Sequence, residues 1–314
     1  MIDSLTLFRR DLQRYGSYFF ETKGFTSDVD AWAVSDRAIQ AARAIRGIER
    51  GPAVMIQGVM PRSGTVYVGE LLRQHPDLYA YPHHIWEFPA LQLAADIRRL
   101  QEKFLLIYRS NIGKIEEADF LPLFGASLLA YLYQPVPPGQ RVLVKMPSVQ
   151  YLSHFFSMFP HENLLILVRD GRDVVHSTLR TWPKLNFVQV CLRWNRSARI
   201  ILTTLEKLKS SDQKGYWMVK YEDTLRQPEA FVREACRHFG LDESRYPYDQ
   251  IGQIRVIGSS KLAKGKVTWR FLERPKDFKP VGYWQKWSPV KRLAFKAIAG
   301  RSLVRLGYCE DLKW

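Results

Sequence analysis

Residues 60–65, with the sequence MPRSGT, have the composition of an anion-binding turn. They follow an apolar run at 53–59 and precede an apolar helical pattern at 65–75, so the order predicts a strand, a tight turn and a helix. Backbone N–H groups at a helix N-terminus are unpaired and bind phosphate or sulfate groups well. An ATP-binding P-loop would continue Gly-Lys-Ser/Thr, but here Gly64 has no lysine after it and the cation, Arg62, precedes it. The turn therefore predicts anion binding without ordinary magnesium–ATP chemistry.

A second group of anion-binding side chains follows a later apolar run. Residues 163–169 are typical of a strand buried on both faces of a parallel sheet, and a helix is predicted to begin at Arg172. Arg169 at the strand end and Ser177 in the helix can converge on one oxyanion, because guanidinium offers a rigid fork and the hydroxyl a further donor. Taken by itself, this segment could equally be a surface charge cluster. Considered together with the turn at 60–65, this segment favours one ligand that carries two phosphoryl groups.

Together these motifs resemble the PAPS-dependent sulfotransferases, which take a sulfuryl group from 3′-phosphoadenosine 5′-phosphosulfate (PAPS) and release PAP. The turn is similar to their 5′-phosphosulfate loop, and the Arg169 and Ser177 pair is similar to their 3′-phosphate motif. Two shorter likenesses are Tyr221-Glu222-Asp223 followed by Pro228, and Leu306-Gly307-Tyr308. The resemblance covers about residues 50–310. It is closer to the bacterial, carbohydrate and tyrosylprotein branches than to the cytosolic small-molecule branch, because the loop reads RSGT.

The resemblance implies a cofactor-binding role for each matching residue. The loop would hold the 5′-phosphosulfate, Arg62 would neutralise the leaving oxygen, and two tyrosines would lie near the adenine. The implied set is Arg62, Ser63, Gly64, Thr65, Val66, Tyr67, Arg169, Ser177 and Tyr221. A late loop, where the family has Arg-Lys-Gly, would close over the 3′-phosphate with Gly258, Ser259, Ser260, Lys264 and Gly265.

The chemistry implied is in-line displacement of a sulfuryl group onto a hydroxyl or amine of the acceptor. Charge grows on the leaving phosphate, so fixed donors and cations there lower the barrier, and no metal is required. Lys145, at the end of a predicted strand, is a candidate to stabilise the transferring group. The cytosolic branch has a histidine two residues after this lysine, whereas Pro147 stands there in this chain.

Three residues in one segment are candidates for the base that takes the acceptor's proton. By spacing from Arg62, His84 falls closest to the glutamate used in the carbohydrate and tyrosylprotein branches, and His83 lies beside it. Histidine titrates near neutrality and is a competent base. Glu87 is the carboxylate of this segment, and it could be the base itself or could orient a histidine.

Four strand–helix alternations predict an α/β fold, a P-loop-like three-layer sandwich with a central parallel sheet flanked by helices. The predicted strands are 53–59, 141–145, 163–169 and 216–221. The main predicted helices are 35–48, 65–75, 186–210, 230–239 and 289–306. The chain, 1–314, is predicted to be one sulfotransferase domain: an N-terminal strap and helix (1–50), a nucleotide-binding core (51–240) with a substrate-pocket insertion (81–139), and a cofactor-closing loop with a C-terminal helix (241–314).

The composition agrees with an anionic ligand. The formal net charge is +16, and residues 255–314 hold 15 Lys/Arg against 4 Asp/Glu, which is +11 of it. Such an excess attracts a polyanionic cofactor, nucleic acid or an acidic membrane surface. A P-loop phosphotransferase is a rival reading, but it needs the missing lysine. A basic nucleic-acid-binding protein is another, but it would not explain two spaced anion motifs, so no nucleic-acid partner is expected.

The remaining features bear on location and partners. Three widely spaced cysteines indicate neither a disulfide framework nor a zinc site, so we expect a reducing, cytoplasmic location. The longest apolar stretch is too short to span a bilayer, although the basic helix at 289–306 could make weak peripheral contact with an acidic membrane. No motif specifies the acceptor or the oligomeric state.

Overall fold

The computed structural model describes residues 29–47, 50–254, 256–257, 261–263, 266–268, 271–272 and 280–314. Most of the predicted strap, residues 1–28, lies outside this part of the chain. The predicted late-loop residues also lie outside it: Gly258, Ser259, Ser260, Lys264 and Gly265.

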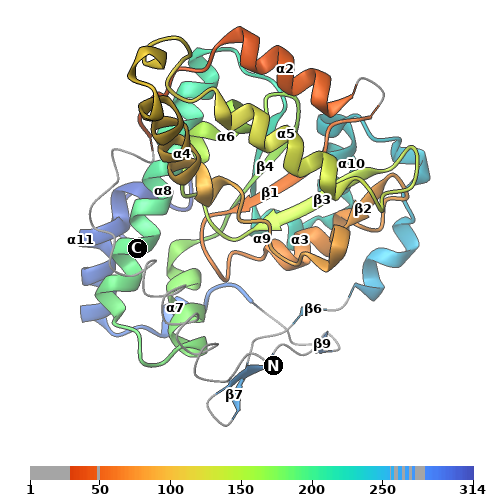
Figure 1. Ribbon diagram of the computed structural model, residues 1–314. Helices are drawn as coiled ribbons and strands as arrows, with labels where there is room; N and C mark the ends of the chain where they lie inside the picture. Colours follow the sequence, from red (N-terminus) through yellow and green to blue (C-terminus); the bar gives the residue numbers. More distant parts are fainter. Residues whose placement is uncertain are drawn as a thin grey trace.

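A parallel sheet of five strands forms the centre of the molecule (Figure 1). In spatial order the strands are β2 (Leu78–Ala80), β3 (Arg141–Met146), β1 (Val54–Gly58), β4 (Asn163–Val168) and β5 (Tyr216–Lys220). All four neighbouring pairs are parallel. Because β1 and β4 are neighbours, the turn after β1 and Arg169 after β4 reach the same edge of the sheet. The predicted fold class is confirmed.

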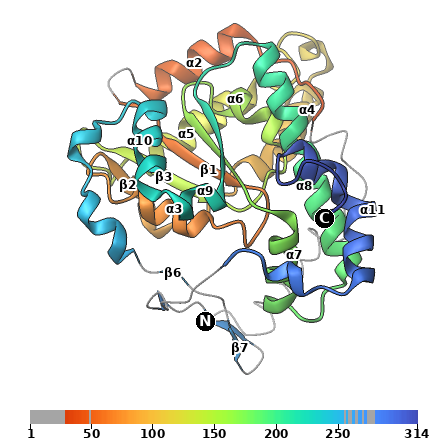
Figure 2. The same cartoon turned by 180° about the vertical axis from the view of Figure 1, so that it is seen from behind.

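Helices cover both faces of this sheet, as Figures 1 and 2 show from opposite sides. On one face, alternate strand residues such as Ile56 and Leu165 pack in one cluster with side chains of α3 and α10. On the other face, Met55 and Ile166 share a larger cluster with side chains of α5, α6, α8 and α11. The helices are α2 (Asp36–Arg46), α3 (Thr65–Leu72), α4 (Ala94–Ile107), α5 (Phe120–Leu132), α6 (Phe155–Met158), α7 (Gly171–Thr181), α8 (Phe187–Ser210), α9 (Tyr221–Arg226), α10 (Pro228–Phe239) and α11 (Pro289–Arg305).

Some elements differ from the sequence prediction. Strand β2 was not predicted, because three residues are too few to show a strand period. Helix α3 ends at Leu72, short of the predicted 75, where buried His75 accepts a hydrogen bond from the Asp77 N–H. Helix α5 lies in the predicted substrate-pocket insertion, where the sequence analysis named no helix. Its Pro122 falls in the first turn, where a missing N–H costs little.

The predicted cofactor-closing loop, which lies within 241–314, also contains short strands. Strand β6 (Val256–Ile257) pairs antiparallel with β9 (Phe271–Leu272), and β7 (Lys261–Ala263) pairs antiparallel with β8 (Lys266–Thr268). In the part of the chain that the structure describes, no helix combines the length and the apolar character needed to cross a bilayer.

Candidate active site

The turn between β1 and α3 depends on one glycine. Gly64 adopts φ +94° as the residue before α3, and a Cβ at this position would lie 2.2 Å from the Tyr221 ring. Arg62 also has a positive φ, 77°, a strained conformation for a residue with a side chain. The buried Ser63 hydroxyl has no hydrogen-bond partner in the part of the chain that the structure describes. The turn therefore keeps a tight backbone and unsatisfied donors next to the N-terminus of α3.

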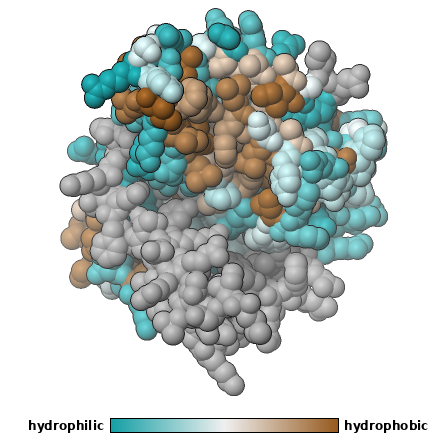
Figure 3. Space-filling model, viewed as in Figure 1, coloured by the Kyte–Doolittle hydropathy of each residue, from teal (hydrophilic) through white to brown (hydrophobic). Residues whose placement is uncertain are grey.

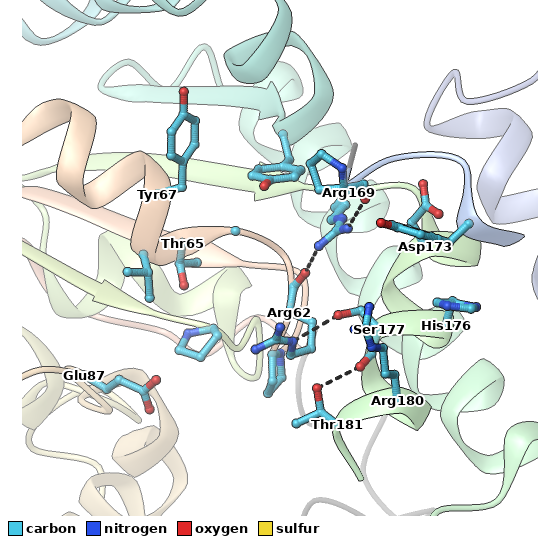
Figure 4. A pocket seen from close by; sticks show the side chains of 17 residues that line it. Arg62, Thr65, Tyr67, Glu87, Arg169, Asp173, His176, Ser177, Arg180 and Thr181 are labelled. Atoms are coloured by element: carbon cyan, nitrogen blue, oxygen red, sulfur yellow. Dashed lines mark hydrogen bonds between the residues drawn. The ribbon is translucent and has the colours of Figure 1, made fainter. Parts of the chain in front are cut away.

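Arg169 connects this turn to the second motif. Its Nη1 donates to the Arg62 carbonyl at 2.6 Å, and its Nη2 donates to the Pro280 carbonyl at 2.7 Å (Figure 4). Arg169 is 8% exposed, its guanidinium lies 4.8 Å from the centre of the Tyr221 ring, and its buried Nε has no hydrogen-bond partner among the described residues. The contacts hold the guanidinium in one orientation at the carboxyl end of β4.

Arg62 lies between the two predicted anion sites. Its Nε donates to the Ser177 hydroxyl at 3.1 Å, so the turn and helix α7 meet through side chains as well as backbone. Burial lowers the pKa of Arg62 to about 10, with the charge of the neighbouring Arg169 as a second cause. Because this pKa is still well above 7, the Arg62 guanidinium is charged at neutral pH.

Helix α7 brings further polar residues that the sequence analysis did not select. Arg180 and Thr181 line the same pocket as Ser177, and the Thr181 hydroxyl donates to the Ser177 carbonyl at 2.9 Å. They follow Ser177 by three and four residues, which places all three on one face of a helix. This spacing from Ser177 could have identified Arg180 and Thr181 from the sequence.

The segment after residue 279 forms another wall of the pocket. The buried Asp173 carboxylate accepts a hydrogen bond from the Gly282 N–H at 2.8 Å, and burial raises the pKa of Asp173. The His176 ring stacks on Tyr283 with 5.5 Å between centroids. Burial lowers the pKa of His176, so the ring is held towards its neutral form.

Tyr67 and Tyr221, which were both predicted to lie near the adenine of the cofactor, are close together. Their rings are perpendicular with centroids 6.2 Å apart, and both residues line the pocket. Tyr67 comes from α3 and Tyr221 from the start of α9, so the two tyrosines form one wall beside the turn.

Glu87 occupies the opposite side of the pocket, across Arg62 from Asp173 and His176 (Figure 4). The ammonium group of Lys145 lies 3.5 Å from its carboxylate and 4.9 Å from the centre of the Trp86 ring. Lys145 is 2% exposed, and burial lowers its pKa while Glu87 opposes that change. A carboxylate and a buried ammonium group therefore meet at this end.

The other two base candidates lie elsewhere. The described lining of the pocket includes Glu87 but neither His83 nor His84. Both histidines are exposed and have positive φ, 52° and 59°. His83 stacks on Tyr131, and its Nε2 lies 3.1 Å from the Tyr131 carbonyl oxygen. Which of the three residues acts as the base stays a prediction.

The described pocket lining gathers the predicted anion-binding residues of the turn, the end of β4 and α7 around one space, except for the fully buried Ser63. It consists of Pro61, Arg62, Gly64, Thr65, Val66, Tyr67, Glu87, Pro147, Arg169, Asp173, His176, Ser177, Arg180, Thr181, Tyr221, Pro280 and Tyr283. The pocket lies at the carboxyl ends of parallel strands, where open α/β sheets bind their ligands. Fold and site together define a P-loop-like α/β protein with a site for an anionic ligand.

Comparison with known proteins identifies the family to which the chain belongs. A sequence model described as "Sulfotransferase family" matches residues 52–245, which is more than half of the chain. The chain belongs to the sulfotransferase family. It is therefore an enzyme that moves a sulfuryl group to an acceptor.

Individual relatives are distant. Protein-tyrosine sulfotransferase 1 of Danio rerio is 23% identical over 268 residues, which is 82% of this chain and 72% of that protein. Protein-tyrosine sulfotransferase A of Caenorhabditis elegans is 21% identical, covering 94% of this chain and 77% of that protein. The sulfotransferase domain from the Synechococcus PCC 7002 olefin synthase superposes with a TM-score of 0.51 at 19% identity, covering 87% of this chain and 98% of that domain. This structural likeness supports the fold.

Proposed function

We propose that the sulfuryl donor is PAPS and that the acceptor is a hydroxyl or amine, with transfer by in-line displacement. One observation carries the proposal: Arg169 donates to the Arg62 carbonyl at 2.6 Å while Arg62 donates to Ser177 at 3.1 Å. The turn predicted to bind one phosphoryl group and the pair predicted to bind another are thus parts of one pocket. A nucleotide with phosphoryl groups at both the 3′ and the 5′ positions of its ribose matches that arrangement.

The residues present fit such a cofactor. The described lining contains Arg62, Arg169 and Arg180 against two carboxylates, so the pocket favours a polyanion. Within the described ranges, the buried Ser63 hydroxyl and the Arg169 Nε are donors without partners. The turn and the first N–H groups of α3 would hold the 5′ end, and Arg169 with Ser177 the 3′-phosphate. When bound, PAPS supplies the sulfuryl group and leaves as PAP, while Arg62 faces the charge that develops on the leaving oxygen.

Glu87 and Lys145 would act on the acceptor side of the pocket. The Glu87 carboxylate, which lines the pocket, would accept the proton of the acceptor hydroxyl or amine, and the buried Lys145 ammonium would stabilise negative charge on the sulfuryl oxygens. His84 is the alternative base, and it would reach the acceptor if the 81–87 segment changed its conformation. The relatives named protein-tyrosine sulfotransferases make the phenol of a tyrosine peptide the first acceptor to test.

A binding experiment tests the donor. PAP should raise the melting temperature of the protein in the presence of a metal chelator, and ADP, which lacks the 3′-phosphate, should raise it much less. A shift seen with ATP and magnesium but not with PAP would reject PAPS and favour phosphoryl transfer. Transfer from labelled PAPS to a panel of hydroxyl and amine acceptors would then identify the acceptor class.

The expected cytoplasmic location is also a proposal. It is supported by Cys191, Cys236 and Cys309, which are all free thiols in the structure.

A further inference from the structure

The most continuous exposed apolar segment among the described residues is the end of α4 and the turn after it, residues 103–115, which we call the α4 tip. Five of its large apolar side chains are more than half exposed: Phe104 (52%), Leu106 (57%), Ile107 (71%), Tyr108 (70%) and Ile112 (57%). Figure 3, in the view of Figure 1, shows apolar residues gathered over the region of α4 and α5. Isolated exposed apolar residues are ordinary, but a contiguous group marks an interaction surface.

Buried polar contacts hold the base of the α4 tip. Gln101, 1% exposed, donates to the Glu116 carbonyl at 2.6 Å and accepts from the Phe120 N–H at 2.7 Å. The Phe104 and Phe120 rings also lie 5.5 Å apart. These contacts tie α4 to the start of α5. The outward position of the apolar side chains is therefore fixed by the fold.

The charges of the α4 tip distinguish between possible partners. Lys103, Arg109 and Lys114 are exposed, and residues 103–115 contain no acid. Beyond its ends, Glu102 and Glu117 both pair with Arg98. A protein–protein interface is depleted of lysine at its apolar centre, whereas a membrane-surface segment combines apolar side chains with Lys and Arg at headgroup level. The pattern favours an anionic lipid surface.

We propose that the α4 tip docks this enzyme on an anionic membrane surface. Ile107, Tyr108 and Ile112 enter the boundary between headgroups and acyl chains, and the three cations contact the headgroups. The tip lies in the chain segment between β2 and β3, which also carries Glu87. Docking therefore engages the same insertion that forms the acceptor side of the pocket. The inference does not depend on the identity of the sulfuryl donor.

Vesicle sedimentation tests this proposal with the full chain. The wild type should bind vesicles of phosphatidylcholine with phosphatidylserine, and it should bind pure phosphatidylcholine more weakly. Ile107→Glu with Tyr108→Glu should lower the partition coefficient at least about tenfold, because it removes two inserting side chains and adds like charge to the lipid. Replacing Lys103, Arg109 and Lys114 by Gln should abolish the preference for phosphatidylserine.

Helix α11 provides the matched control. Val290 and Leu293 are 76% and 69% exposed beside Lys291 and Arg292, so Val290→Glu with Leu293→Glu makes the same chemical change on another basic helix. This variant should bind vesicles like the wild type. All variants should keep the wild-type melting temperature, since every substituted side chain is exposed.

Three results would overturn the proposal. The wild type could fail to sediment with either vesicle, the α4-tip variant could bind as well as the wild type, or the α11 variant could be the one that loses binding. Self-association that the Ile107→Glu and Tyr108→Glu changes abolish, without vesicle binding by the wild type, would assign the surface to a second copy of the chain.

Discussion

Arg169 is the residue on which the two halves of the site depend. It donates a hydrogen bond to the Arg62 carbonyl and contacts Tyr221, while its Nε has no partner among the residues that the structure describes. Hydrogen bonds to charged groups contribute about 1.5–3 kcal/mol each. Arg169→Ala should therefore weaken PAP binding at least about tenfold in isothermal titration calorimetry.

A surface arginine gives the matching control for Arg169. Arg226 on α9 is 70% exposed and pairs with Asp223, so Arg226→Ala makes the same change in net charge away from the pocket lining. It should leave PAP affinity within about twofold of wild type. Equal losses in the two variants would show that overall charge, and not the position of Arg169, governs binding.

The base can be assigned by comparing two single substitutions. Glu87 lines the pocket and His84 does not, so Glu87→Gln should lower kcat by at least about a hundredfold, while His84→Ala should keep most of the activity. The measurement is initial-rate kinetics with labelled PAPS and an acceptor found by the screen. Full activity in Glu87→Gln with loss in His84→Ala would pass the role to the histidine. PAP affinity should be unchanged in both variants.

At the scale of elements, the turn before α3 is the most constrained piece of backbone. Gly64→Ala would put a Cβ 2.2 Å from the Tyr221 ring at φ +94°, so the turn or α9 must move. We expect a loss of stability greater than the roughly 1 kcal/mol of an ordinary Gly-to-Ala change at positive φ, together with loss of PAP binding. Thermal unfolding and PAP titration measure the two effects.

Gly240 provides the control that distinguishes the effect of backbone strain from the effect of the clash with Tyr221. It also has a positive φ, 60°, but a Cβ there meets no atom within 4 Å. Gly240→Ala should cost stability and leave PAP affinity unchanged. If both variants bind PAP like the wild type, the conformation of the 60–64 turn is not what the cofactor requires.

Strands and helices with a strong pattern were predictable from the sequence, and short elements were not. The apolar runs that became β1 and β4 identify buried strands because both sheet faces are covered. Strand β2 forms because it can pair with the edge of β3. That pairing is a tertiary contact, which the local sequence pattern does not show. The position of Glu87 relative to His84 depends on positive φ values at Tyr81, His83 and His84, and counting residues from Arg62 cannot anticipate those turns.

At the scale of the whole molecule, Glu162 holds the edge of the sheet opposite the site. This carboxylate, 2% exposed, accepts from Arg46 at 2.8 Å, from Arg50 at 3.3 Å and from the Ala53 N–H, so it joins the end of α2 to the chain entering β1. Glu162→Gln would leave two cations without their charge partner. Breaking a buried pair costs about 3–5 kcal/mol, so urea unfolding should show a loss of that order.

The control for Glu162 is an exposed ion pair. Glu206 is 65% exposed and pairs with Arg305, so Glu206→Gln should change the free energy of unfolding by less than about 1 kcal/mol. PAP affinity should be unchanged in both variants, because neither residue lines the pocket. If the Glu162→Gln and Glu206→Gln variants have equal free energies of unfolding, Glu162 stabilises the protein no more than an exposed ion pair does.

The pocket is completed by residues that are far apart in the order of synthesis. Arg169 bonds the Pro280 carbonyl and Asp173 bonds the Gly282 N–H, at separations of 111 and 109 residues. On the ribosome, the turn and α7 therefore emerge long before the segment that finishes their surroundings. A nascent chain arrested before residue 280 lacks one wall of the pocket, so competence to bind the cofactor arrives late in translation.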